Sequence, residues 1–528
     1  MLRLSASLLL ILSCSLLRPA AASAQSDPAG APVLDTIIIV RENVFSPEEV
    51  DKNFFFRTAN GLRVQTREFV ISRELLFQEG QPYDSARVAE SEQNLRQLSL
   101  FRHVDIDTAR VAGKLAALVT TRDGWSTKIP LKVAAESEGT ITGKIGLTET
   151  NLLGTGTFVH VAYRKDVDRD GVEMSTRWRR FAGTRLILSG SYFGLSDGNI
   201  GDWEFGLPFL GSEDREAISY SGLAADRRIL RFRTADAGDP DTTFYQRRAF
   251  INRLGVAYAP VAKSSRYLRL GARAEIRREE YILQQDTAAA IPDTVTASLT
   301  LATEFRRVRY KEVRFFNGFA DEDIDVSYYA GLSATLAPEA LGWRRNGIGS
   351  SLVLSGAERL PDGFIKGSIA ANGLFTSAGL DSGQVVLNLT FGYKPGRRHA
   401  TVLHASAGLQ ENPPPGQEFD LGFDMPPRSF APHSFTGTRT LWGTAEHRWF
   451  VWDSILDLFR LGFAAFIDYG GAWYEDQDPR FGGNIGFGLR LGGSRSSARD
   501  AGRLDLGYRF GDLAGRHWVL SFGPGFVF

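Results

Sequence analysis

Two short motifs in the chain contain residue types that could do chemistry. The sequence Gly194-Leu-Ser-Asp-Gly198 has the Gly-x-Ser-x-Gly pattern of a serine nucleophile, which needs a strand, a sharp turn and a helix to present its hydroxyl group to a histidine. The preceding segment, 189–193, has the pattern of a strand, but no helical pattern follows Gly198. We therefore interpret the motif as a hairpin turn and predict no serine hydrolase.

The second motif has the spacing found at the start of a calcium-binding loop. Its oxygen ligands would come from Asp166, Asp168 and Asp170, followed by Gly171. Arg177, however, occupies the twelfth position, where calcium needs a bidentate glutamate. We interpret the segment as a solvated hairpin tip, with weak calcium binding at the cell surface as the alternative. Because the seven histidines lack zinc-type spacing and no phosphate-binding glycine loop with a lysine occurs, we predict no enzyme, no metal and no cofactor.

The composition narrows the class of protein. The 528 residues include 55 glycines and 36 phenylalanines, and the 61 basic residues balance the 61 acidic ones. A neutral chain gives no reason to expect nucleic acid as a partner. Beyond its beginning, no apolar run is long enough for a membrane-spanning helix. A helical membrane protein is therefore excluded, and a soluble protein of two or three domains is the plain alternative.

The first 24 residues are predicted to be a secretory signal peptide. Arg3 supplies the positive charge, 8–17 the apolar core and Ala22-Ser23-Ala24 the cleavage site. A lipoprotein-type site at Cys14 is the alternative, but this residue lies inside the apolar core. Cleavage would remove the only cysteine, so the exported chain would have neither disulfides nor a cysteine nucleophile.

The rest of the chain divides near Gly124 into two regions of different period. From 33 to 123, short strands alternate with amphipathic helices in the order strand, helix, helix, strand, strand. The segment near 47–65 is expected to be an insertion between the first strand and the first helix. From 126 to 528, helical periodicity gives way to short alternating segments separated by glycine, aspartate and proline turns.

The last eleven residues show this alternation most clearly. One side of the extended chain carries small residues, and the other carries Trp518, Leu520, Phe522, Phe526 and Phe528. A closed barrel is the only sheet that leaves no unpaired backbone groups in lipid, so this pattern predicts a transmembrane β-barrel. At about 25 residues per strand and connection, the region would hold roughly sixteen antiparallel strands. A soluble sandwich also alternates, but it would not place such aromatic residues at its end.

Several motifs carry a resemblance to a known family. Thr66 to Ile106, with its Gly80-Gln-Pro-Tyr83 turn, resembles a polypeptide-transport-associated (POTRA) domain of the periplasm. Thr150 to Gly156 resembles a tight turn, and Phe466-Ile-Asp-Tyr-Gly470 a strand, of the BamA/TamA-like barrels, which include the bacterial surface antigen barrels. The resemblance implies an outer-membrane barrel with one POTRA domain at 33–123.

The resemblance also implies a segment that folds back into the barrel. Leu421 to Phe430 is similar to the family's inward tip, and Arg428, Ser429 and Phe430 would form it, although the family has glycine where this chain has Ser429. Asp468 shares a face with two glycines and therefore points inward, where an unpaired carboxylate is unfavourable. Arg428 is its natural bidentate partner, with the inward-facing Glu446 and Asp505 as competitors and a solvated Arg428 as the alternative.

The function implied by the resemblance is assembly of other proteins. The barrel would insert or translocate unfolded barrel or secreted clients, or other envelope components, and accessory periplasmic or lipoprotein subunits would be further partners. The POTRA domain would add a client strand to its sheet edge near Val104–Asp107 or Leu115–Thr121. The seam between 128–135 and the last strand would open into the bilayer, weakened by Pro524 and its neighbouring glycines. A passive or structural pore is the alternative function.

Overall fold

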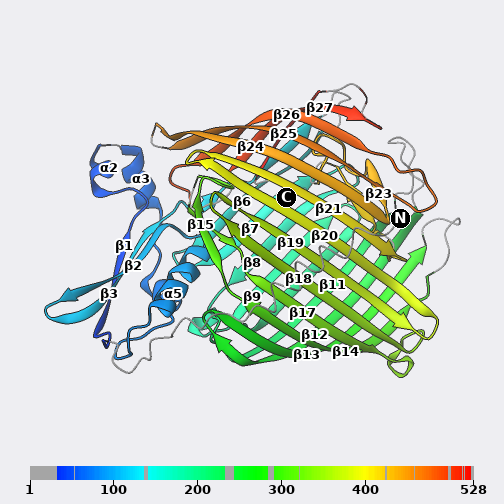
Figure 1. The fold of residues 1–528 in the computed structure, drawn as a ribbon, viewed down its shortest axis with the longest axis horizontal. Helices are drawn as coiled ribbons and strands as arrows, with labels where there is room; N and C mark the ends of the chain where they lie inside the picture. Colours follow the sequence, from blue (N-terminus) through cyan, green and yellow to red (C-terminus); the bar gives the residue numbers. More distant parts are fainter. Residues whose placement is uncertain are drawn as a thin grey trace.

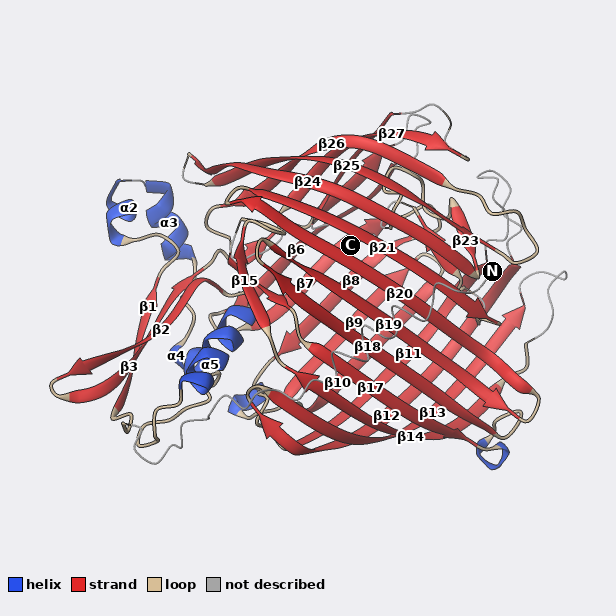
Figure 2. Cartoon of the chain, viewed as in Figure 1, coloured by secondary structure: helices blue, strands red, loops and turns tan. Residues whose placement is uncertain are grey.

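A computed structural model describes residues 32–524 except 53, 136–140, 232–242, 284–290, 320, 415, 423–424, 457, 497–500, 514 and 516–517. The predicted signal peptide, 1–24, lies outside the described residues, as do Phe526 and Phe528. A small domain lies beside one end of a large β-barrel (Figures 1 and 2). None of the described helices combines the length and the apolar character needed to cross a membrane.

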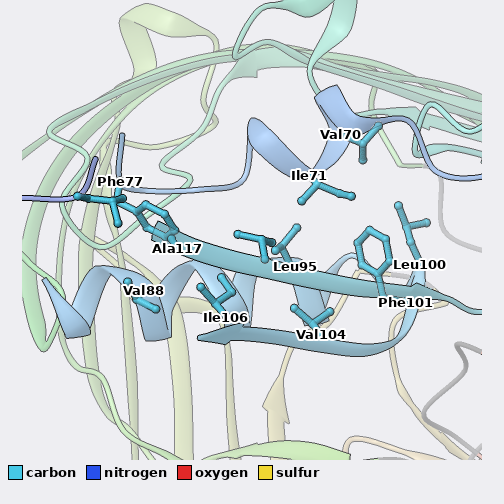
Figure 3. Packing of buried hydrophobic residues seen from close by; sticks show 12 residues of the cluster. Val70, Ile71, Phe77, Val88, Leu95, Leu100, Phe101, Val104, Ile106 and Ala117 are labelled. Atoms are coloured by element: carbon cyan, nitrogen blue, oxygen red, sulfur yellow. The ribbon is translucent and has the colours of Figure 1, made fainter. Parts of the chain in front are cut away.

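The N-terminal domain is a three-stranded sheet covered by helices. The central strand β3 pairs parallel with β1 and antiparallel with β2. Helix α5 is capped by Asp84, the residue before its first turn, whose carboxylate accepts hydrogen bonds from the N–H groups of Ala86 and Arg87. Its Val88 and Leu95 pack with Ile71, Val104 and other apolar residues into one core (Figure 3). The elements are β1 Thr36–Glu42, α2 Pro47–Lys52, α3 Phe54–Leu62, α4 Glu68–Ser72, α5 Ser85–Gln97, β2 Phe101–Val111 and β3 Lys114–Asp123.

This domain corrects the prediction of a POTRA domain. The described residues of this region form four helices, and α2 and α3 occupy the segment that was expected to be an insertion. The structure therefore shows an α+β domain of its own arrangement and no clear POTRA domain. The sequence order of the strands does not reveal such additions, because α2 and α3 are short and α3, although amphipathic, has no buried residues.

The remainder of the chain closes into an antiparallel barrel. Segments β4 and β5 are two pieces of one strand, both paired with β6, so the ring contains twenty strands among the described residues. The strands are β4 Thr127–Lys128, β5 Leu131–Ala135, β6 Ile141–Leu152, β7 Thr157–Lys165, β8 Asp170–Trp178, β9 Ile187–Leu195, β10 Gly198–Leu207, β11 Glu216–Arg231, β12 Thr243–Lys263, β13 Arg266–Leu283, β14 Thr294–Arg307, β17 Tyr328–Ala337, β18 Gly347–Leu360, β19 Gly363–Thr376, β20 Gly379–Gly396, β21 His399–Glu411, β24 Arg439–Ile455, β25 Phe459–Trp473, β26 Gly482–Gly493, β27 Gly502–Gly511 and β28 Trp518–Pro524.

Outside this ring, the described residues also form two short hairpins and two 3-10 turns. They are β15 Tyr310–Arg314 with β16 Asp321–Asp325, β22 Phe419–Leu421 with β23 Phe435–Gly437, η1 Phe181–Gly183 and η2 Glu339–Leu341.

The prediction of sixteen strands was wrong, because many connections are shorter than assumed. The turns 196–197, 264–265, 361–362 and 377–378 each join two long strands through two residues. A two-residue hairpin turn is the shortest common link between antiparallel strands. Each strand with its connection therefore takes fewer residues than the average from which sixteen strands were predicted.

The outer surface of the barrel is apolar. On β12, for example, Leu254, Val256 and Tyr258 are about half exposed, and Ile485 and Phe487 on β26 are exposed in the same way. Large exposed apolar side chains recur on strands around the ring, whereas a water-facing surface would carry polar residues there. The barrel is therefore a membrane all-β structure with lipid around it.

The N-terminal domain contacts turns at one end of the barrel. The ion pair between Glu74 and Arg180 joins it to the β8–β9 turn at 3.1 Å, and Arg87 pairs with Glu213 of the β10–β11 turn at 2.8 Å. Further bonds join Thr66 to Asn151 at 2.7 Å, Arg96 to Asp323 at 3.1 Å, and Glu49 to Arg495. Because these turns belong to strands from β6 to β27, the domain spans much of the mouth at this end.

Candidate functional site

The connection between β21 and β24 enters the barrel from the end opposite the N-terminal domain. It forms the small β22–β23 hairpin and carries Arg428, Ser429 and Phe430 at its tip. These three side chains are 1%, 4% and 2% exposed. The tip predicted to fold into the lumen is therefore buried against the inner wall.

Arg428 contacts every carboxylate that was named as its possible partner. Its Nε and Nη2 atoms donate to the two carboxylate oxygens of Asp468 at 2.8 and 3.0 Å. Its Nη1 atom donates to Glu446 at 2.8 Å and to Asp505 at 3.3 Å. The guanidinium carbon also lies 4.0 Å from the centre of the Phe466 ring. The structure thus joins the residues that had been treated as competing partners into one cluster.

The cluster contains further residues that the sequence reasoning missed. Arg448 and Arg490 each donate to Glu446, and Arg490 also donates to Asp505 at 2.6 Å. All of these charged groups are at most 6% exposed. We call the following residues the luminal network: Arg428, Thr444, Glu446, Arg448, Asp468, Asn484, Arg490, Arg503 and Asp505.

The missed residues carried a readable signal. Arg448 lies two residues beyond Glu446, and Arg490 lies among the inward-facing glycines of its strand. Because side chains alternate across a strand, both positions point into the lumen. A search for charged residues at inward-facing strand positions would therefore have identified these arginines as well as the carboxylates.

Ser429 replaces the glycine of the resembling family, and the wall accommodates it. A Cβ atom placed on Gly507 would lie 2.2 Å from the Ser429 hydroxyl oxygen, so the hydroxyl group needs a glycine opposite. The Ser429 N–H group donates to Asn484 at 3.3 Å, and its carbonyl oxygen accepts from Arg509. The tip is therefore held by backbone bonds in addition to the Arg428 side chain.

The luminal network has the chemistry of a structural cluster that fixes the inserted loop in place. Each acid oxygen accepts hydrogen bonds from arginine, threonine or asparagine donors, so every carboxylate of the network is paired. Within the described residues, no three metal-ligating side chains gather into a possible metal site. The arrangement can hold the inserted loop against strands β24 to β27.

The last described strand forms the other candidate site. Trp518 and Leu520 are 54% and 52% exposed and face outward, whereas Val519 and Ser521 face inward. Phe522 is half-buried and pairs with Val133 of β5. In the described residues, β28 and β5 are joined by three residue pairs: Leu520 with Ala135, Ser521 with Ala134, and Phe522 with Val133. Among the described residues, this seam is much shorter than the β12–β13 ladder, which runs from Tyr245–Leu283 to Lys263–Arg266.

The two chemistry-like motifs lie at the same end as the inserted loop. The segment Gly194–Gly198 forms the turn of the β9–β10 hairpin, so a second strand follows it and no helix. In the loop before β8, Asp166 pairs with Arg164, and Asp168 accepts from His433 of the inserted loop at 2.8 Å. The residues of the calcium-like motif thus point to different partners.

His433 lies between two aspartates, Asp168 and Asp420, which bind its Nε2 and Nδ1 atoms at 2.8 and 2.5 Å. Burial alone would lower the pKa of His433, but the two carboxylate hydrogen bonds outweigh burial and raise this pKa to about 9. The protonated imidazole therefore ties the inserted loop to the β7–β8 loop at neutral pH.

This bridge predicts a pH-dependent contribution to stability. Because the pKa is raised in the folded protein, the stabilisation is complete below the unfolded-state pKa near 6.5 and is lost as the pH rises through about 9. We expect the unfolding free energy of His433→Gln, measured in detergent with urea, to lie below that of the unchanged protein at pH 6. The two should converge at pH 10. A gap of equal size at both pH values would contradict the bridge.

Comparisons with known proteins give a likeness of fold only. No family model matches the chain, and no curated protein matches it. Among solved structures, BamA from Haemophilus ducreyi lacking POTRA domains 1–3 is 12% identical with a TM-score of 0.40, covering 93% of this chain and 85% of that one. CdiB from Escherichia coli is 11% identical with a TM-score of 0.46, covering 96% and 92%. The FrpB iron transporter from Neisseria meningitidis (F3-3 variant) is 9% identical with a TM-score of 0.42, covering 81% and 88%. These values are too low to assign the chain to a family.

Proposed function

We propose that the protein resides in a bacterial outer membrane and inserts or translocates other proteins by opening its seam. The observation that carries this proposal is the short pairing of β28 with β5 in the part of the chain that the structure describes. Each backbone pair lost in lipid leaves polar groups unsatisfied, so a barrel opens most easily where it has fewest pairs to lose. The broken first strand, interrupted at Ile129 and Pro130, weakens the same place because proline donates no hydrogen bond.

A cavity inside the barrel beside β5, one of the two strands of the seam, supports the proposal. Its volume is about 680 Å³, and its lining includes Lys132 of β5, Lys144 of β6 and Asp420 of the inserted loop. Charged walls suit the polar face of a strand or the loop of a barrel client, while the lipid side suits its apolar face. A client strand could then occupy the opened seam between cavity and bilayer.

The N-terminal domain supplies a possible first contact for clients. Strand β3 is paired on both sides, so Leu115–Thr121 is not a free edge, which corrects one of the two expected capture sites. The outer edge of β2 has no paired strand among the described residues and includes Val104–Asp107. We propose that extended clients add a strand at β2, since an unpaired strand edge binds peptides through backbone hydrogen bonds. Accessory periplasmic or lipoprotein subunits would act at the same face.

The test is the protein content of the outer membrane with and without this protein. We expect depletion to lower the levels of particular barrel or surface proteins, and expression of the unchanged gene to restore them. The purified protein in planar bilayers is expected to show brief openings. Unaltered levels of all other barrels, together with a steady open conductance, would overturn the proposal in favour of a passive pore.

A further inference from the structure

The connection between β14 and β17 enters the barrel from the side of the N-terminal domain. It forms the hairpin of β15 and β16, whose strands pair only with each other in the described structure. Its tip carries Phe315, Phe316 and Phe319, which are 5%, 4% and 4% exposed. These rings pack against Phe364, Phe450 and other inward residues of the barrel wall. We call residues 309–326 the plug hairpin.

The wall is shaped to receive the plug hairpin. A Cβ atom on Gly392 would lie 2.7 Å from the Phe316 ring, and one on Gly492 would lie 2.6 Å from the Phe319 ring. Both positions therefore exclude any larger residue while the plug is seated. Gly392 belongs to β20 and Gly492 to β26, so the seat spans the wall from one strand to the other.

Cations of the wall hold the backbone of the tip. Arg448 donates to the carbonyl oxygen of Phe316 at 2.8 Å, Lys394 to that of Phe315 at 3.1 Å, and Arg460 to that of Phe319 at 2.9 Å. Within the hairpin, the buried carboxylate of Glu322 accepts hydrogen bonds from the N–H groups of Phe316, Asn317 and Gly318. The tip is thus a preformed body. Withdrawing it would break side-chain bonds but no strand pairing of the barrel.

A single helix of the N-terminal domain also holds the plug hairpin. Arg96 on α5 binds both carboxylate oxygens of Asp323 on β16, with Nε at 3.1 Å and Nη2 at 3.3 Å. The Asp323 side chain is only 8% exposed, so the bidentate pair is little screened by water. At its other end, the plug meets the luminal network, because Arg448 binds both Phe316 and Glu446.

We propose that the plug hairpin is a movable luminal plug that the N-terminal domain keeps seated through the Arg96–Asp323 pair. A domain displaced or turned by a bound polypeptide would release Asp323, and the hairpin could then leave its glycine-lined seat. The same movement would free Arg448 and loosen the luminal network next to β27. The plug would thereby couple events at the N-terminal domain to the barrel interior. This inference goes beyond the proposed function, and its test needs no bound polypeptide.

The test measures how fast a thiol reagent reaches the seated tip. In Phe319→Cys, the thiol replaces a buried ring, and a bulky charged maleimide should label it slowly in the otherwise unchanged protein. We expect Arg96→Ala to raise the labelling rate at least tenfold. The exchanged pair Arg96→Asp with Asp323→Arg should return the rate to within about twofold of the starting value. Gly492→Ala is the positive control, because its added methyl group would collide with the Phe319 ring. Since this control needs the Phe319 ring, its labelling is measured with Phe315→Cys instead of Phe319→Cys.

A matched control distinguishes loss of the Arg96–Asp323 pair from general loosening of the N-terminal domain. Arg87 lies on the same helix and forms the ion pair to Glu213 of another barrel turn. Arg87→Ala should leave the labelling rate unchanged. Equal rates for Arg96→Ala and the parent, or equal increases for Arg87→Ala and Arg96→Ala, would overturn the proposal. Heat-modifiable migration on gels shows whether each variant has a folded barrel. If Arg96→Ala does not, Asp323→Asn takes its place, and the same increase in labelling rate is expected.

Discussion

Arg428→Ala is expected to lower the unfolding free energy of the barrel by about 3–5 kcal/mol, because it removes one cation from a buried cluster and leaves carboxylates facing one another. Arg428 binds Asp468, Glu446 and Asp505 from a position that is 1% exposed. Arg428→Lys keeps the charge but cannot bind Asp468 with two parallel bonds, so its effect should be intermediate.

The measurement is urea unfolding in detergent, followed by heat-modifiable migration and tryptophan fluorescence. The control is Arg248→Ala, since Arg248 forms an ion pair with Asp226 at 3.1 Å but is 54% exposed in its side chain. An exposed pair contributes about 0–1 kcal/mol, so this variant should be nearly unchanged. Equal small effects for both arginines would show that the inserted loop is not locked by Arg428.

Asp468→Ala gives the pairwise test of the same contact. The double variant with Arg428→Ala should cost clearly less than the sum of the two single changes, because the second change removes a group that has already lost its partner. A cost equal to that sum would mean that the two side chains do not act as a pair. Because Arg428 also binds Glu446 and Asp505, we expect the Asp468 change alone to be the milder one.

Strand parity predicted much of this site. Alternation placed Asp468, Glu446 and Asp505 on the inner face, and the resemblance of 421–430 placed an arginine opposite them. The same rule, applied to β24 and β26, would have added Arg448 and Arg490. Parity fixes the side of the sheet but not the stagger between strands, which depends on turn lengths. The sequence therefore could not show that one arginine reaches three acids.

Other parts of the fold left weaker signals in the sequence. The number of strands depends on turn lengths, and two-residue turns such as 361–362 carry little pattern of their own. In the sequence, the tip of the plug hairpin is a short apolar segment, Arg314 to Phe319, without clear alternation. Its burial arises from glycines at 392 and 492, which are distant in sequence. Such complementarity between remote segments cannot be read from local periodicity.

The luminal network lies next to the strand that bounds the seam. Asp505 belongs to β27, which pairs with β28 from Gly502–Pro524 to Tyr508–Trp518. Its bonds to Arg428, Arg490 and Arg503 fix β27 to the inserted loop and to β26. The wall on this side of the seam is therefore rigid, and opening should take place between β28 and β5.

A disulfide across the seam is expected to abolish function. Ser521 and Ala134 are paired residues of β28 and β5, and paired residues of antiparallel strands lie about 4.5–5.5 Å apart, within the range that a disulfide spans. Replacing both with cysteine should cross-link the barrel under oxidising conditions. The only natural cysteine, Cys14, lies in the predicted signal peptide, so no other thiol should compete.

The matched control places the same cross-link in the middle of the wall. Ser355 and Ser368 are paired residues of β18 and β19, in a ladder that runs from Gly347–Thr376 to Leu360–Gly363. Cysteines at these positions should form a disulfide without any effect, because this part of the wall is not expected to open. Each single cysteine at the seam should also be harmless.

The most direct measurement is the level of dependent outer-membrane proteins in cells that carry only the Ser521→Cys, Ala134→Cys protein, with and without a reductant. We predict that these levels fall as in depleted cells while the seam is oxidised, and recover after reduction. The Ser355→Cys, Ser368→Cys protein should support normal levels throughout. Normal levels with a fully oxidised seam would contradict lateral opening.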